Sequence, residues 1–225
     1  MKQRIRNIIG AGLFAMVFLA APLVIAVSDT TDSTTDTTTT TTTADDDKVD
    51  TDPVKVKSRL EGLKTSLKIK LTTAEQANLK AKCKAAQTIA AKLNDRFGTS
   101  VTTRTKAYDN LSKHLTDIIA KLKDKGVDVT KLQQESTELQ AKIATYKTDL
   151  ASYKQALSDV KTIDCVADPA AFKAALQTAR TAHDKLVADA IAVKTYVKDT
   201  IKPTLEEIRK SLEAQESTNK TEEAQ

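Results

Sequence analysis

Apolar residues recur at the spacing of an α-helix over a long stretch in the middle of the chain. The spacing is about 3.6 residues, and Arg104 is the one charged residue in this otherwise apolar series. Thr72 and Glu75 have the spacing of a capping box, and Gly126 is a residue type that ends helices. The pattern therefore predicts one helix over residues 74–125. The series is Leu79, Cys83, Ala86, Ala90, Leu93, Phe97, Val101, Arg104, Tyr108, Leu111, Leu115, Ile118 and Leu122.

Two further helices are predicted after this one. A heptad pattern between residues 128 and 164 predicts the second helix. Asp168 and Pro169 suit the N-cap and first position of the third, whose apolar series continues to Leu212. Pro203 is expected to kink this third helix near residue 199. The heptad residues of the second helix are Leu132, Leu139, Ile143, Tyr146, Leu150, Tyr153, Leu157 and Val160.

Gly98, Thr99 and Ser100 look like a turn that would divide the first helix, giving four short helices. The apolar series nevertheless keeps its phase through this point, and the two cysteines supply an independent test. A continuous helix places Cys165 about 10 Å from Cys83, whereas a hairpin at Gly98 separates them by roughly 37 Å. Only the first arrangement comes near the ~7 Å limit between bridged Cα atoms.

An exported chain with two cysteines most simply forms one disulfide. We therefore predict a stabilising Cys83–Cys165 disulfide and an uninterrupted first helix. The fold class is predicted to be all-α. Residues 72–215 are expected to form an elongated, coiled-coil-like antiparallel three-helix bundle.

A basic amphipathic helix is predicted ahead of the bundle, over residues 54–71. Its apolar residues are Val56, Leu60, Leu63, Leu67 and Leu71. It is expected either to pack on the bundle as a fourth helix or to lie on a surface of anionic lipid. The candidate residues for binding an anionic surface are Lys55, Lys57, Arg59, Lys64, Lys68 and Lys70.

The chain begins with an export signature. Residues 8–27 are uncharged, follow three basic residues, and are long enough at about 1.5 Å per residue to cross a ~30 Å hydrocarbon layer. Pro22 and the small residues near Ala26 favour cleavage there or near Ser28. We predict that residues 1–26 are a signal peptide, with retention as a membrane anchor as the alternative. The rest is expected to be extracellular, periplasmic or at the cell surface.

Low-complexity segments flank the helical body. Residues 29–53 contain twelve Thr and eight Asp, a composition with too few apolar side chains to offset the entropy of ordering. Residues 27–53 are therefore predicted to be a disordered spacer, which some hosts would O-glycosylate. The last residues, 216–225, are predicted to be a disordered tail.

Charge and motifs limit the function. Residues 54–215 carry 30 Lys and Arg against 19 Asp and Glu, so the body is basic. No phosphate-binding glycine loop, HExxH or GxSxG motif occurs, and His114 and His183 each stand alone. We therefore expect no enzymatic activity, no cofactor, no metal site and no small-molecule substrate.

Two resemblances add to this interpretation. The segments "IIAKLKDKGVDVTKL", "TIDCVADPAAFKAAL" and "TYVKDTIKPTLEEIR" resemble uncharacterised exported helical proteins of candidate-phylum bacteria, which carry no known activity. The segment "LTTAEQ", residues 71–76, resembles the LTxxQ boxes of small periplasmic helical chaperones, although Gln76 is one place late and no second box occurs.

The favoured hypothesis is an exported, non-enzymatic helical spacer or interaction module of the cell envelope. Its basic body suggests an envelope polymer, a lipid surface or a protein as partner. A periplasmic holdase chaperone is the alternative, and it should expose a large apolar patch. A nucleic-acid role ranks third, because the charge permits it but no known binding module is present.

Overall fold

The structure is a computed structural model that describes residues 49–222. About seven-eighths of these residues are helical (87%), and no strand occurs among them, which confirms the all-α prediction. The predicted signal segment, most of the predicted spacer and residues 223–225 lie outside the described residues. Residues 216–222, predicted to belong to a disordered tail, are helical. Within residues 49–222, no helix combines the length and the apolar character needed to cross a bilayer.

The first long helix, α3 (Thr73–Lys123), begins and ends within two residues of the predicted bounds, 74 and 125. The Thr72 side chain accepts a hydrogen bond from the Glu75 backbone N–H, and the Glu75 carboxylate accepts one from the Thr72 N–H at 2.8 Å. The helix runs without a break past Gly98, so the continuous-helix prediction is confirmed. It ends at Lys123, and the turn that follows contains Gly126, whose φ of 74° is readily adopted only by glycine.

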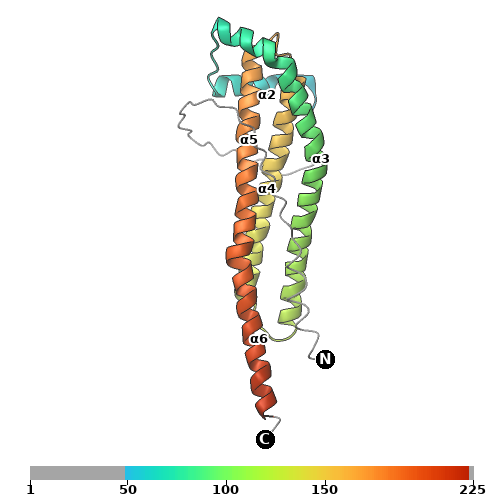
Figure 1. Ribbon diagram of the computed structural model, residues 1–225, viewed down its shortest axis with the longest axis vertical. Helices are drawn as coiled ribbons and strands as arrows, with labels where there is room; N and C mark the ends of the chain where they lie inside the picture. The colour runs from blue at the N-terminus through green and yellow to red at the C-terminus, as the bar shows by residue number, and fades with distance from the viewer. Residues whose placement is uncertain (1–48, 223–225) are drawn as a thin grey trace. The chain divides into compact units, whose positions relative to one another are not determined.

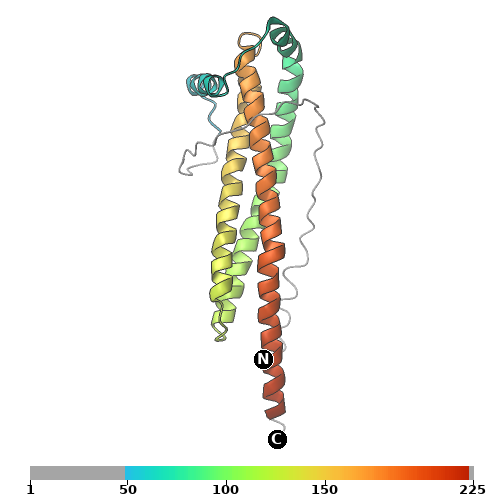
Figure 2. The ribbon, with the colours of Figure 1, turned by 90° about the vertical axis from the view of Figure 1, so that its left-hand side faces the viewer.

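The second long helix, α4 (Thr130–Thr162), packs against both α3 and α5 (Figures 1 and 2). The rings of Tyr108 and Tyr146 meet edge to face with centroids 5.0 Å apart, and those of Phe97 and Tyr153 are 4.8 Å apart. The predicted heptad residues of α4 are buried and form the centre of the helical bundle.

The last helical stretch contains three segments in sequence: α5 (Pro169–Tyr196), the π-helical η1 (Val197–Ile201) and α6 (Lys202–Glu222). They follow one another along the same line in Figure 1. Where the sequence predicted a kink near residue 199, the structure has the π-helical turn. Pro203 has no N–H and its ring would collide with the carbonyl of Asp199 in a regular helix. The wider turn, in which the Lys202 N–H reaches the Val197 carbonyl, relieves this conflict.

The N-terminal helix α2 (Pro53–Ser66) lies across one end of the bundle and packs on α5, burying Val56 and Leu60 (Figures 1 and 2). The Asp52 side chain caps it by accepting a hydrogen bond from the Val54 N–H at 2.9 Å. It ends at Ser66, before the predicted boundary at residue 71, because Lys68 adopts a left-handed backbone conformation with φ 48°. Residues 67–72 form a non-helical linker to α3.

Candidate functional site at the disulfide-linked end

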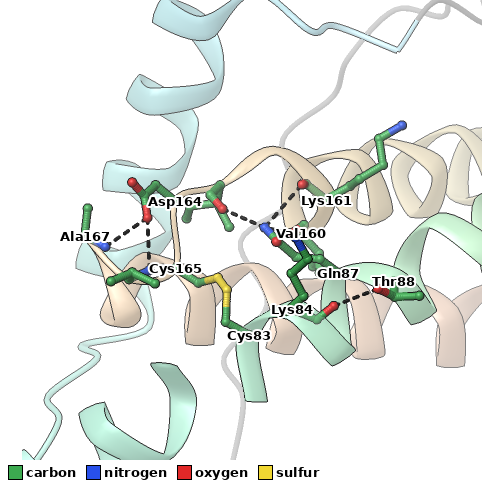
Figure 3. The surroundings of a disulfide bond; sticks show 11 residues. Cys83, Lys84, Gln87, Thr88, Val160, Lys161, Asp164, Cys165 and Ala167 are labelled. Atoms are coloured by element: carbon green, nitrogen blue, oxygen red, sulfur yellow. Dashed lines mark hydrogen bonds between the residues drawn. A yellow bond between two sulfur atoms is a disulfide. The ribbon is translucent and has the colours of Figure 1, made fainter. Parts of the chain in front are cut away.

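The predicted disulfide joins Cys83 of α3 to Cys165 in the loop between α4 and α5, with Cα atoms 6.0 Å apart (Figure 3). Both cysteines are buried. One turn along α3, the Gln87 amide donates to the carbonyls at the end of α4, including Ile163 at 2.8 Å. Asp164 accepts hydrogen bonds from the loop N–H groups of residues 166 and 167. This end of the bundle is therefore fixed by the disulfide and by hydrogen bonds from side chains to the backbone groups of the α4–α5 loop.

An ion pair between α2 and α4 fixes α2 in place. Arg59 donates two hydrogen bonds to Asp159, from Nε at 2.9 Å and from Nη2 at 2.6 Å. The Asp159 side chain is only 3% exposed, so its charge depends on this partner. The hydrogen bond to Asp159 also raises the pKa of Arg59. The Gln155 amide adds a third donor to Asp159 at 3.0 Å.

Gln155 also holds the segment just before α2. Its Oε1 accepts a hydrogen bond from the Asp50 N–H at 2.7 Å, and its Nε2 donates to the Asp50 carbonyl at 3.0 Å. The Asp50 carboxylate pairs with Lys55 at 3.3 Å. The hydrogen bond from the Asp52 N–H, followed by the contact with Lys55, lowers the pKa of Asp50. The chain is thus fastened to α4 before α2 begins.

The linker between α2 and α3 is anchored on both sides to the start of α5. Lys64, near the end of α2, pairs with Asp168 at 3.0 Å, and Glu75, in the first turn of α3, pairs with Lys173 at 3.3 Å. Asp168 and Lys173 are about 7.5 Å apart along the helix axis. Hydrogen bonding to Asp168 raises the pKa of Lys64. Linker residues 67–72 are therefore held close to this end of the bundle.

The structure divides the six candidate cations into two groups. Lys55, Arg59 and Lys64 are ion-paired with Asp or Glu residues. The others are exposed and have no ion pair among residues 49–222; they are Lys57, Lys68 and Lys70. Lys68 and Lys70 lie on the linker and not on the predicted helix. The six residues do not form one uniform basic helix face.

Three further lysines at this end were missed in the sequence interpretation: Lys80, Lys82 and Lys84. They lie on α3 around Cys83, are exposed, and have no ion pair within the described part of the chain. The alternating run "KAKCK" was visible, but only the disulfide places it at the same end as α2. We call Lys57, Lys68, Lys70, Lys80, Lys82 and Lys84 the free-lysine group.

Polar groups also occur inside the bundle, away from this end. Burial, with the adjacent Asp149 carboxyl, raises the pKa of Asp189 to about 6. Asp189 Oδ2 is buried, and no described residue donates a hydrogen bond to it. A proton shared between the Asp149 and Asp189 carboxyls would supply the missing hydrogen bond. Glu135 is buried and accepts a hydrogen bond from the Thr204 hydroxyl at 2.7 Å.

Among residues 49–222 there is no group of three His, Cys, Asp or Glu side chains placed to hold a metal ion. The His183 ring lies 3.2 Å from its neighbour Asp184 and meets the Tyr153 ring edge to face, and His114 is exposed. At the opposite end, a depression of about 410 Å³ lies between the α3–α4 turn and α6.

Comparison with protein-family models, with curated proteins and with solved structures finds no match for this chain. The two resemblances described from the sequence therefore stay predictions. The disulfide is consistent with an oxidising, exported environment.

Proposed function

We propose that this chain is a non-enzymatic, exported cell-envelope protein. Its long helices act as a three-helix, coiled-coil-like spacer, and its disulfide-linked end is the interaction module. The observation that carries the proposal is the free-lysine group, which is exposed on a support fixed by the disulfide, by Arg59–Asp159 and by the anchored linker. Fixed cations attract anionic partners without spending free energy on ordering the support.

The spacer role rests on the lengths of the helices. The 51 residues of α3 correspond to about 77 Å at 1.5 Å per residue, enough to separate a partner bound at the disulfide-linked end from anything that contacts the opposite end of the bundle. In this arrangement the predicted Thr-rich spacer and signal or anchor segment precede α2, so the chain enters the bundle at the proposed binding end.

Co-sedimentation with isolated cell envelopes tests the proposal. The purified protein is expected to sediment with envelopes at low ionic strength and to be released as the salt concentration rises, because exposed charges are screened beyond about 10 Å at 0.1 M salt. Binding that does not depend on salt, or no binding at all, would contradict it. An aggregation assay with a chemically denatured enzyme as client separates this function from the holdase alternative, which predicts suppression of light scattering.

A further inference from the structure

We infer that the partner of the free-lysine group is a flexible linear polyanion, bound while α2 remains docked, and not the surface of a lipid bilayer. This inference rests on the proposed function and narrows its partner to one chemical class. It follows from the apolar face of α2, the directions in which the lysines of α3 point, and the chemistry of lysine.

The apolar face of α2 is occupied. A helix that lies on a bilayer must insert its apolar residues among the acyl chains. In α2, Val56 (8% exposed) and Leu60 (4% exposed) are packed on α5, Leu63 is half-buried, and Val54 in the first turn is exposed. Undocking α2 would also separate Arg59 from Asp159, whose side chain is almost fully buried. While docked, α2 presents its polar side, including Lys57, to a partner.

The lysines of α3 point in different directions. Successive residues of an α-helix are turned by about 100°, so Lys82 and Lys84 lie on opposite flanks of the buried Cys83. Lys80 lies on the same flank as Lys84, one turn away. A flat bilayer surface reaches one flank of a helix at a time. A flexible chain of anions can bend around the helix and contact both flanks.

Two more lysines of the group lie on the linker at the same end of the bundle. Lys68 and Lys70 lie on the linker whose two sides are anchored to α5 through Lys64–Asp168 and Glu75–Lys173. Their backbone is therefore positioned before the partner binds, which lowers the entropic cost of association. Residues 49–84 as a whole carry nine Lys and Arg against four Asp and Glu, so an anionic chain meets a net attraction there.

The one arginine of residues 49–84, Arg59, is paired with Asp159, so the cations left for a partner in this region are all lysines. Lysine is a compact point charge, whereas arginine provides a planar fork that matches one phosphate or carboxylate. A group made only of lysines therefore responds to the density of negative charge along a chain. Polymers with one charge per short repeat fit this surface better than isolated small anions.

The test measures binding of the full-length protein to long-chain inorganic polyphosphate. Two variants with the same charge change on the same helix are compared: Lys80/Lys82/Lys84→Gln at the proposed site, and a control at the other end of α3. The control is Lys106/Lys113/Lys121→Gln, whose lysines are also exposed. The site variant is expected to lose affinity about tenfold and to reduce the log–log salt slope by about 2 to 3, and the control is expected to stay within about twofold.

Three comparison ligands at equal phosphate concentration separate the possible partners: pyrophosphate, vesicles containing anionic phospholipid, and a single-stranded oligonucleotide. Polyphosphate is expected to bind most tightly, because its charges are the most closely spaced. The oligonucleotide, a flexible chain with more widely spaced charges, is expected to bind more weakly but still through the lysines, and pyrophosphate and the vesicles are expected to show no strong lysine-dependent binding. Hydrogen exchange of α2 is expected to stay slow in the complex. Equal losses in both variants, lysine-dependent vesicle binding as strong as polymer binding, faster exchange in α2, or a preference for the oligonucleotide would each overturn the inference.

Failure of this inference can be distinguished from failure of the proposed function. If the protein sediments with envelopes in a salt-dependent way but prefers vesicles to polyphosphate, only the assignment of the partner is wrong. If envelope binding is absent in the unmodified protein, the proposed function itself is wrong. Circular dichroism checks that both variants fold. Their affinities are compared only if both give the helical spectrum of the unmodified chain.

Discussion

Removing the Cys83–Cys165 bridge should lower the stability of the bundle by several kcal/mol. The bridge closes a segment with a sequence separation of 82 residues and joins α3 to the α4–α5 loop. In the chain-entropy model, a loop of this length restricts the unfolded chain by about 4.5 kcal/mol at 25 °C. We use Cys83→Ala with Cys165→Ala, because both side chains are buried and alanine introduces no new polar group.

Urea unfolding followed by circular dichroism at 222 nm is the suitable assay, because most of the described chain is helical. With a denaturant slope of about 2 kcal/mol per molar urea, the expected loss moves the unfolding midpoint down by about 2 M. The slope itself should increase slightly, because an unfolded chain without the bridge exposes more surface.

The unmodified protein unfolded in a reducing agent is the control for this experiment. Reduction removes the covalent link but keeps the sulfur atoms, so it separates the effect of the link from the cost of truncating buried side chains. The reduced protein and the double variant should agree within about 1 kcal/mol. If the double variant unfolds at the same urea concentration as the oxidised protein, the disulfide does not stabilise this end, and the reasoning is refuted.

Three other substitutions test single contacts. Burial and a neighbouring carboxyl raise the pKa of Asp189 from 3.8 to about 6, so stability should fall as pH rises through this interval, and Asp189→Asn should remove the fall in urea unfolding at several pH values. Arg59→Met leaves the carboxylate of Asp159 without its guanidinium and should speed hydrogen exchange in α2. Thr204→Val removes the donor to the buried Glu135 and should cost about 1–3 kcal/mol in urea unfolding.

Each of these substitutions has an exposed counterpart elsewhere in the helices. Asp117→Asn and Thr195→Val repeat the same chemical changes at solvent-facing positions, and Lys57→Met likewise replaces an exposed cation by methionine. Effects within about 0.5 kcal/mol are expected for all three. An Asp189→Asn variant with an unchanged pH profile would contradict a raised pKa. Protection of α2 that survives Arg59→Met, or a Thr204→Val cost no larger than that of Thr195→Val, would show that these contacts contribute little.

The long helices could be predicted from the sequence because their apolar period is sustained over many turns. Gly98, Thr99 and Ser100 suggested a turn, and the local pattern did not exclude it. The cysteines decided the question, since a bridge has a fixed reach and the hairpin placed Cys83 and Cys165 too far apart. A covalent distance limit therefore resolved what propensity left open.

The division between paired and free cations could not be predicted. Arg59 and Asp159 are 100 residues apart in the chain, and the pairing between them depends on how α2 crosses α4. Lys64 and Asp168 are separated to a similar degree. A sequence gives the number of charges on a helix face, but tertiary packing decides which charges remain available to a partner.

The π-helical form of the turn before Pro203 could not be predicted from the sequence pattern either. A proline inside a helix predicts disruption of the hydrogen bond to the carbonyl four residues earlier. Whether the helix bends or widens depends on its packing, and here Ile201 and Leu205 are both buried against the bundle. A widened π-helical turn keeps these residues facing inward, which a sharp change of direction would not.

The docking of α2 links the stability of the bundle to the choice of partner. The same apolar residues, Val56 and Leu60, cannot pack on α5 and insert into a bilayer at the same time. Any lipid binding that needs them is weakened by the free energy of docking, at about tenfold for each 1.4 kcal/mol. A polyanion that contacts only exposed lysines bears no such penalty. Weakening Arg59–Asp159 should therefore favour lipid over polymer, which makes this ion pair a determinant of partner specificity.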